Sequence, residues 1–248
     1  MIATPPGYDA TQESAARFDQ SHRTRLVVTG RAPSQMLSGV LSGTIPADPG
    51  HRHYSTVLTP KGLMITDLFM IRMPGEDERF LLDVSPAGRD ALLDYFKKVL
   101  PPRFAKVTDA SAAWKHEVVV GPRSADALGQ ALHETGVEDV GLAELEALMP
   151  DEVLHVDVAG LSVVVVRSPD AIPPRFDLFI EANAEAGGKA AGPFYDAIIA
   201  AVPVEGSDAA WSALRVEVGT PEFGIDMVEK TIPIEAGIEQ RAIDGTKG

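Results

Sequence analysis

The chain has 248 residues, enough for one large domain or two modest ones, and its 45% hydrophobic and 23% charged residues are ordinary for a folded globular protein. It contains no cysteine, which excludes disulfides, thiolate catalysis and cysteine-ligated metal or iron–sulfur centres, and we expect a cytoplasmic protein. The net charge of −14 argues against broad nucleic-acid binding, and the absence of an apolar run of about 18 residues argues against a membrane span.

The first half of the chain predicts short elements separated by loops. In order, we expect a loose arm, a half-buried strand, a short helix, a loop, a hairpin and a strand over residues 1–17, 22–30, 33–41, 42–53, 54–73 and 79–84. The hairpin is predicted because two β-rich runs flank Pro60-Lys61-Gly62, a turn in which Pro precedes Gly.

The second half predicts helices interleaved with strands. A helix over 85–100 is expected because Ser85 can act as its N-cap, Pro86 suits the first helical position, and Pro101-Pro102 stops it. Then follow a strand, a helix, a strand pair, a strand and two helices over 114–121, 122–136, 152–167, 175–182, 188–202 and 207–218. Helices interleaved with hairpins predict an α+β fold, with antiparallel sheets packed against helices.

Residue types alone give few chemical signals. The P-loop, the dinucleotide-binding glycine pattern, the H-E-x-x-H motif and the nucleophile elbow are all absent. Asp67 lies in the apolar strand LMITDLFMI and needs a partner if it is buried, so it is either a site residue or a surface group at a strand edge. His51 and His53 could ligate a metal, but they lack a third ligand, and we favour a solvated loop without metal.

The stretch 214–237, LRVEVGTPEFGIDMVEKTIPIEAG, follows no simple helix or strand period. Its glycines permit positive φ or close backbone approach, its prolines stop a helix, and its carboxylates can accept hydrogen bonds from backbone donors or from a nitrogen-rich ring. These residues are Gly219, Gly224 and Gly237, Pro221 and Pro233, and Glu217, Asp226 and Glu235. Two interpretations stay open at this point: a stitched, compact connection, or part of a ligand site.

This stretch closely resembles the signature of the aminomethyltransferase-like folate-binding family, R-x-E-x-G-x-P-x-[FY]-G-x-D followed by P-x-E-A-G. The family includes the T-protein of the glycine cleavage system and the YgfZ-type proteins of iron–sulfur cluster maintenance. FDQSH (18–22), YSTVLTPKGLMITDL (54–68) and RFDLFI (175–180) also match the family pattern. The resemblance therefore covers most of residues 18–248.

Within the family, the sequence is most similar to the YgfZ-type branch. The T-protein has two adjacent Asp at the end of the second hairpin strand, the first essential for catalysis, and this chain has Thr66-Asp67 there. The Gly-Glu-Asp-Gly turn of the T-protein, whose Glu holds the pterin, corresponds here to residues 171–175, which contain no Glu. The ending IDGTKG, with Lys247, resembles the lead into the YgfZ motif K-G-C-Y-x-G-Q-E.

The resemblance implies a T-protein/YgfZ-like α+β fold of two domains without a C-terminal barrel. The first, folate-binding domain is expected over 1–49 plus 156–248, and an inserted ferredoxin-like domain over 50–155. The resemblance assigns tetrahydrofolate binding to Tyr54, Asp67, Arg215 and Glu217, and motif or structural roles to Gly219, Pro221, Gly224, Asp226, Glu235, Gly237 and Lys247. Such a site requires the tail to fold back beside the Tyr54 hairpin and to wall a pterin-sized cavity.

The leading hypothesis is a YgfZ-like accessory protein that binds tetrahydrofolate and supports iron–sulfur enzymes without aminomethyl transfer. Its partners would be a folate and iron–sulfur client proteins. Two alternatives stay open. One is a divergent folate-dependent aminomethyl or one-carbon transferase that uses Asp67 in catalysis, and the other is a non-catalytic scaffold that has lost folate.

Overall fold

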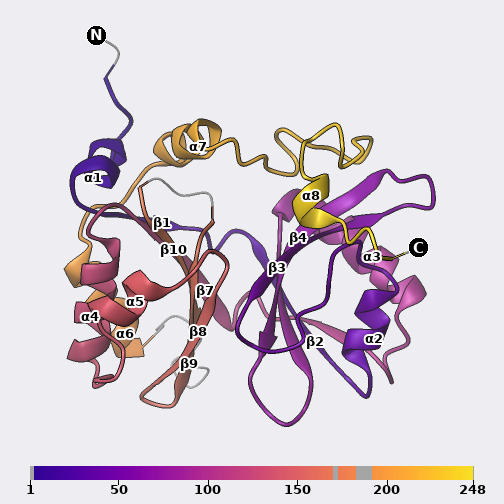
Figure 1. Ribbon diagram of the computed structural model, residues 1–248, viewed down its shortest axis with the longest axis horizontal. Coiled ribbons are helices and arrows are strands. Elements are labelled where there is room, and N and C mark those ends of the chain that lie inside the picture. Colours follow the sequence, from indigo (N-terminus) through magenta and orange to yellow (C-terminus); the bar gives the residue numbers. More distant parts are fainter. Residues whose placement is uncertain (1–2, 170–172, 183–191, 248) are drawn as a thin grey trace. The chain divides into compact units, whose positions relative to one another are not determined.

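The computed structural model describes residues 3–169, 173–182 and 192–247, which pack into two compact units (Figure 1). Unit 1 comprises Met1–Ser21 with Ala112–Thr220, and unit 2 comprises His22–Ser111 with Pro221–Gly248. Each unit contains helices and a five-stranded sheet whose neighbouring strands are all antiparallel. The expected combination of antiparallel sheets and helices is confirmed. The domain boundaries at 49/50 and 155/156, the ferredoxin-like insert and the missing barrel stay predictions.

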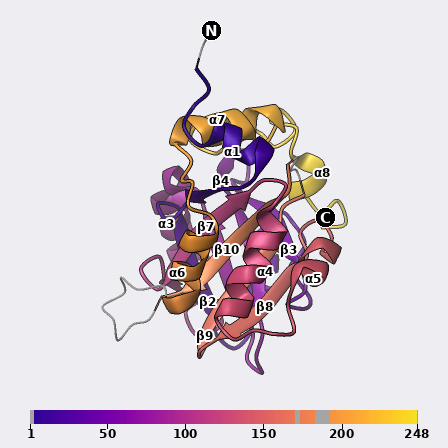
Figure 2. The ribbon, with the colours of Figure 1, turned by 90° about the vertical axis from the view of Figure 1, so that its left-hand side faces the viewer.

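The sheet of unit 1 is covered by helices on both faces. Its strand order is β1 (Ala16–Asp19), β7 (Trp114–Val120), β10 (Arg175–Glu181), β9 (Leu161–Arg167) and β8 (Val153–Val158). The helices of this unit are α1 (Tyr8–Glu13), α4 (Ser124–Glu134), α5 (Leu142–Ala147), α6 (Gly192–Ala201) and α7 (Asp208–Glu217). Helices α4, α5 and α6 lie against one face, and α1 and α7 pack against the other face at β1 and β7 (Figure 2).

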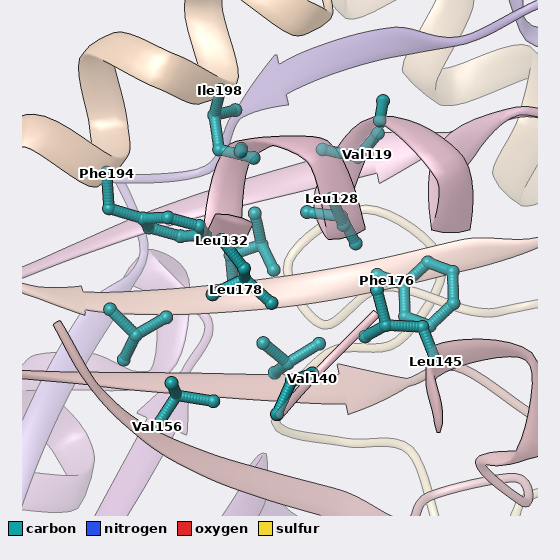
Figure 3. Packing of buried hydrophobic residues seen from close by; sticks show 14 of the residues in the cluster. Val119, Leu128, Leu132, Val140, Leu145, Val156, Phe176, Leu178, Phe194 and Ile198 are labelled. Atoms are coloured by element: carbon teal, nitrogen blue, oxygen red, sulfur yellow. The ribbon is translucent and has the colours of Figure 1, made fainter. Parts of the chain in front are cut away.

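The main core of unit 1 forms because strand and helix periods place apolar residues on facing surfaces. In β10, Phe176 and Leu178 are two residues apart and therefore point to the same face of the sheet. In α4, Leu128 and Leu132 are one turn apart and face that surface. The buried side chains labelled in Figure 3 are Val119, Leu128, Leu132, Val140, Leu145, Val156, Phe176, Leu178, Phe194 and Ile198.

Unit 2 has helices next to both faces of its sheet. The strand order is β3 (Arg52–Leu58), β4 (Met64–Met73), β5 (Arg79–Val84), β2 (Thr24–Thr29) and β6 (Lys106–Asp109). Its helices are α2 (Pro33–Ser38), the 3₁₀ turn η1 (Pro86–Gly88), α3 (Arg89–Val99) and α8 (Glu239–Ala242). Leu68 and Met70 of β4 and Leu82 of β5 share one core with Leu37 of α2 and Phe96 of α3. Strand alternation sends the intervening residues to the opposite face.

The tail after residue 220 folds back beside the β3–β4 hairpin, as the sequence predicts (Figure 1, yellow). The Met64 amide donates a 2.9 Å hydrogen bond to the carbonyl of Thr231, and the Ser85 hydroxyl donates one of 2.7 Å to the carbonyl of Phe223. An apolar cluster closes the contact, with Met64, Phe223, Met227, Ile238 and Ala242 buried and Tyr54 and Leu58 packed against them.

Some predicted elements differ from the structure. Residues 1–17 are not only a loose arm, because they contain α1 and the start of β1, a strand of four residues that is too short for a clear period. Ser85 does not cap a helix with its side chain: the helix begins after η1, and the hydroxyl is hydrogen-bonded to the tail. Strand β6 and helices α5 and α8 were not predicted. Of the helix predicted over 188–202, residues 188–191 lie outside the described residues.

Candidate functional site

The face of the unit 2 sheet opposite α2 and α3 carries Tyr54 and Asp67. Thr56 of β3 pairs with Asp67 of β4, and Tyr54 pairs with Phe69, so Tyr54 is the diagonal neighbour of Asp67 on this face. The Tyr54 hydroxyl donates a 2.7 Å hydrogen bond to Oδ2 of Asp67. The two residues that the sequence assigned to folate binding in the hairpin therefore touch each other.

Asp67 is a buried carboxylate with one oxygen still available. Its exposed fraction is 7%, and within the described part of the chain Oδ1 has no hydrogen-bond partner. Burial raises the pKa of Asp67 because it disfavours the charged form, and this outweighs the opposing effects of Arg23 and of the hydrogen bond from Tyr54. The sequence left open whether Asp67 is a site residue or a surface group at a strand edge. The structure excludes the surface group, because Asp67 is buried and hydrogen-bonded to Tyr54.

Tyr54 is fixed by aromatic and cationic neighbours. Its ring lies 4.9 Å from the ring of Phe69, between centroids, and the Arg241 guanidinium of α8 lies 5.6 Å from the Tyr54 centroid. Burial, followed by the nearby Asp67 charge, raises the pKa of the Tyr54 phenol. The phenol therefore stays protonated and acts as a hydrogen-bond donor to Asp67.

Two further charged residues belong to this face and were missed in the sequence. Arg23, directly before β2, donates from Nε to Oδ2 of Asp83 on β5 at 2.7 Å. Burial lowers the pKa of Arg23, but the charges of Asp83 and then Asp67 more than offset it, so that its pKa is raised. A signal was present: Asp83 interrupts the apolar strand RFLLDV as Asp67 interrupts LMITDLFMI.

Thr66 points away from this site. Its side chain is fully buried on the face that carries α2 and α3, where a Cβ added to Gly88 of η1 would lie only 1.9 Å from Thr66 Oγ1. An acidic residue at position 66 would therefore lie on the face opposite to Tyr54. The absence of Asp at position 66 does not remove the carboxylate from the Tyr54 face, because position 67 supplies it.

A separate cavity of about 350 Å³ lies where the hairpin, α3 and the tail meet in unit 2. It is lined by Thr59, Met64, Ile65, Ala91, Asp94, Tyr95, Lys98 and Glu229. Because Tyr54 and Asp67 do not line it, this is not the pterin-sized cavity expected beside Tyr54, which stays a prediction. Across the described ranges, no group of three or more His, Cys, Asp or Glu could hold a metal ion.

Comparison with known proteins identifies the family of this chain. A family model described as the GCVT N-terminal domain matches residues 6–246. The chain belongs to this family.

Curated relatives of this chain are named aminomethyltransferases. The aminomethyltransferase of Mycobacterium leprae (strain TN) is 28% identical over 234 residues, covering 92% of this chain and 58% of the relative. That of Streptomyces coelicolor is 25% identical over 238 residues, with the same two coverages. The chain thus spans about 58% of the length of these relatives.

A solved structure shows the same fold. The glycine cleavage system aminomethyltransferase T of Bartonella henselae superposes with a TM-score of 0.75 at 20% identity, covering 97% of this chain and 60% of that one. In the part of the chain that the structure describes, no helix is both long and apolar enough to cross a membrane.

The other two residues that the sequence assigned to folate binding, Arg215 and Glu217, lie on α7 in unit 1. Arg215 is buried, and its Nη1 donates a 2.9 Å hydrogen bond to the carbonyl of Thr220. Glu217 is exposed and accepts a 2.6 Å hydrogen bond from the hydroxyl of Tyr8. Both have partners within unit 1, and their role toward folate stays a prediction.

Short-range hydrogen bonds join residues within the signature segment. Oδ2 of Asp226 accepts from the amide of Glu222 at 2.9 Å, and Oε2 of Glu235 accepts from the amide of Ile232 at 3.4 Å. Gly224 needs both freedoms of glycine, since its φ is +96° and a Cβ there would lie 2.4 Å from the Cβ of Ala87. These contacts are compatible with a structural role of the motif residues, and the choice between this role and a ligand site stays open.

Two further predictions concern the ends of the described ranges. Lys247 donates from Nζ to the carbonyl oxygens of Leu41 at 3.2 Å and of Gly43, and this ties the tail to the loop after α2. The turn that matches the pterin-binding turn of the T-protein covers residues 171–175, of which 171 and 172 lie outside the described residues.

Proposed function

We propose that this chain binds tetrahydrofolate on the Tyr54–Asp67 face and takes part in folate-dependent one-carbon transfer, with Asp67 as the carboxylate that faces the reacting nitrogen. One observation carries the proposal. A buried carboxylate is held at 2.7 Å by a phenol, and it keeps one oxygen without a partner in the described part of the chain. An unused acceptor in a buried place is costly unless a ligand completes it.

The chemistry of this face suits a pterin ring. Pterins carry several N–H groups, and Oδ1 of Asp67 is an acceptor of the kind that such groups need. Tyr54 and Phe69 add aromatic surface for a flat ring. Membership of the GCVT N-terminal domain family and the aminomethyltransferase names of the relatives support the same ligand class.

Each residue has a separate part in the proposed reaction. When bound, tetrahydrofolate supplies the nitrogens that accept the one-carbon unit. Asp67 stabilises the positive charge that develops next to it in the transition state, which a neutral side chain cannot do. Tyr54 keeps the carboxylate in one orientation through its hydrogen bond, so that little reorganisation is required during the reaction.

The geometry favours the transferase alternative over an accessory protein without catalysis. The argument for lost catalysis rested on Thr66, and Thr66 lies on the other face of the sheet. An iron–sulfur role and the YgfZ-type branch stay predictions, based on the departures from the T-protein pattern at Thr66 and residues 171–175 and on the resemblance of residues 243–248 to the YgfZ motif. Participation of Arg215 and Glu217, iron–sulfur clients as partners and a cytoplasmic location also stay predictions.

The proposal is tested by a transfer assay with tetrahydrofolate and an aminomethyl donor, in which the one-carbon folate product is measured. Asp67→Asn should lower the rate by at least about a hundredfold, because it removes the charge and keeps the shape. Asp94→Asn on α3 is the matched control, since Asp94 is 68% exposed and forms its ion pair with Lys97 of the same helix. Equal rates for Asp67→Asn and the control would overturn the proposal.

A further inference from the structure

We infer that Arg23 is a positioning residue for Asp67: fixed by its ion pair with Asp83 on the same face of the sheet, it favours the ionised form of the Asp67 carboxylate, the form that accepts hydrogen bonds from a ligand. The consequence for ligand binding rests on the proposed function. The effect on Asp67 itself does not, and it can be measured in the protein without ligand. Arg23 is not part of the residues that the family resemblance assigned to the site.

Three of the four residues concerned lie on adjacent strands, and the fourth lies directly before the next strand of the sheet. In the order β3, β4, β5, β2, the side chains are Tyr54, Asp67, Asp83 and Arg23, the last directly before β2. Hydrogen bonds of 2.7 Å join Tyr54 to Asp67 at one end and Arg23 to Asp83 at the other. Phe69 pairs with Asp83, so Asp67 and Asp83 are diagonal neighbours on one face, with Cβ atoms about 7–8 Å apart by sheet geometry.

Two buried carboxylates on one face repel each other, which favours the protonated form of one of them unless a cation offsets the repulsion. Arg23 is placed to prevent this, because its charge acts on both Asp83 and Asp67. For the pKa of Asp67, burial raises it most, the Arg23 charge lowers it next, and the Asp83 charge raises it by less. Arg23 therefore acts on the charge of Asp67 as well as pairing with Asp83.

The guanidinium also has unused donors. Within the described part of the chain, its hydrogen-bond partner is Asp83, reached through Nε, and its side chain is 13% exposed. The terminal nitrogens of Arg23 therefore remain free to donate on the face that carries Asp67. The ion pair with Asp83 fixes the position of the Arg23 guanidinium. Its other N–H groups can still donate to a second acceptor.

Other charged groups of unit 2 face the same region and must be considered in any titration. Arg25 pairs with Asp83 across β2 and β5, Arg52 lies over the ring of Phe69, and Arg241 lies near Tyr54. Glu222 of the tail acts on Arg23. Arg23 is the cation whose charge has the largest lowering effect on the pKa of Asp67.

The direct test is a ¹³C NMR titration of aspartate carboxyl groups in the full chain, with the Asp67 signal assigned from its loss in Asp67→Asn. Arg23→Gln should shift the midpoint of the Asp67 titration upward, and Arg23→Lys should restore most of the wild-type midpoint because it keeps the charge. Arg89→Gln is the matched control, since Arg89 forms an exposed 2.7 Å ion pair with Asp109 in the same unit. A midpoint in Arg23→Gln equal to that of the control would overturn the inference.

A second variant covers the case in which Arg23→Gln does not fold, since it leaves Asp83 as a buried charge without this partner. The double variant Arg23→Gln/Asp83→Asn removes both charges, and the Asp67 midpoint should still rise because the Arg23 effect is the larger. An unchanged or lower midpoint would overturn the inference. Tetrahydrofolate binding is then measured by calorimetry: absence of binding in the wild type defeats the proposed function, whereas the titration alone decides the role of Arg23.

Discussion

Thr66 and Asp67 are neighbours in sequence, yet their side chains lie on opposite faces of one sheet. Thr66 packs against Gly88 on the face that carries α2 and α3, and Asp67 accepts a hydrogen bond from Tyr54 on the other face. The alternation of side chains along a strand makes this separation unavoidable. A carboxylate that works with Tyr54 must therefore be at position 67.

A charge placed at position 66 should destabilise the protein without improving the site. Thr66→Asp would bury a carboxylate at a fully enclosed position, at a cost of more than about 2 kcal/mol in the free energy of unfolding. Thr66→Val keeps the shape and loses one hydrogen bond, to the carbonyl of Asp67, at about 1 kcal/mol. Urea unfolding measures both. A Thr66→Asp variant that is as stable as Thr66→Val and transfers faster than wild type would contradict the assignment of faces.

Neutralising Asp67 should stabilise the protein at neutral pH. The pKa of Asp67 is higher in the folded than in the unfolded chain, so the wild type loses stability as pH rises from the unfolded pKa through the folded one. Asp67→Asn escapes this loss and keeps an oxygen for Tyr54. The stability difference between Asp67→Asn and wild type should grow with pH and then level off, in unfolding experiments from acidic to mildly alkaline pH. A difference that shrinks as pH rises would show that the folded pKa is lowered instead.

Removing the Tyr54 hydroxyl should move the pH dependence of the site upward. In Tyr54→Phe the hydrogen bond that lowers the pKa of Asp67 is lost, so a higher pH is needed to ionise the carboxylate. The rising limb of the pH profile for transfer should shift to higher pH. Tyr95→Phe, on α3, is the control and should leave the profile in place. A shift to lower pH in Tyr54→Phe would contradict the role given to this phenol.

Two glycines of the signature segment should differ in tolerance. Gly224 and Gly237 both have positive φ, at +96° and +67°, so alanine is strained at either position. A Cβ at Gly224 would in addition meet Ala87 at 2.4 Å, whereas a Cβ at Gly237 meets nothing within 4 Å. Gly224→Ala should therefore cost about 1–3 kcal/mol more than Gly237→Ala in urea unfolding. Equal costs would mean that the tail is not seated against η1 as the structure shows.

Much of the fold was readable in the sequence because its signals are local. The Pro60-Lys61-Gly62 turn predicts the hairpin, and the helix expected over 207–218 is α7, whose first amides are capped by Ser207, which accepts from the amide of Ala210 at 3.2 Å. β1 and β6 were missed because strands of four residues show almost no period, and each depends on its partner strand for stability. Ser85 was misread because its partner, Phe223, is 138 positions away.

The site was readable only in part. Tyr54 and Asp67 came from the family pattern, and the structure joins them by a hydrogen bond. Arg23 and Asp83 were not recognised because the strand order β3-β4-β5-β2 is not the chain order, and β2 reaches its place beside β5 only in the folded sheet. The meaning of Thr66 was likewise hidden until the hairpin register assigned each residue to a face.

The central claim is that the Asp67 carboxylate, and no group at position 66, receives tetrahydrofolate. Isothermal titration calorimetry with tetrahydrofolate tests it most directly, using wild type, Thr66→Val and Asp67→Asn. We predict equal affinity for wild type and Thr66→Val, and at least about tenfold weaker binding for Asp67→Asn, because a hydrogen bond to a charged group is lost. No heat with the wild type, or equal affinity for Asp67→Asn and Thr66→Val, would contradict the claim.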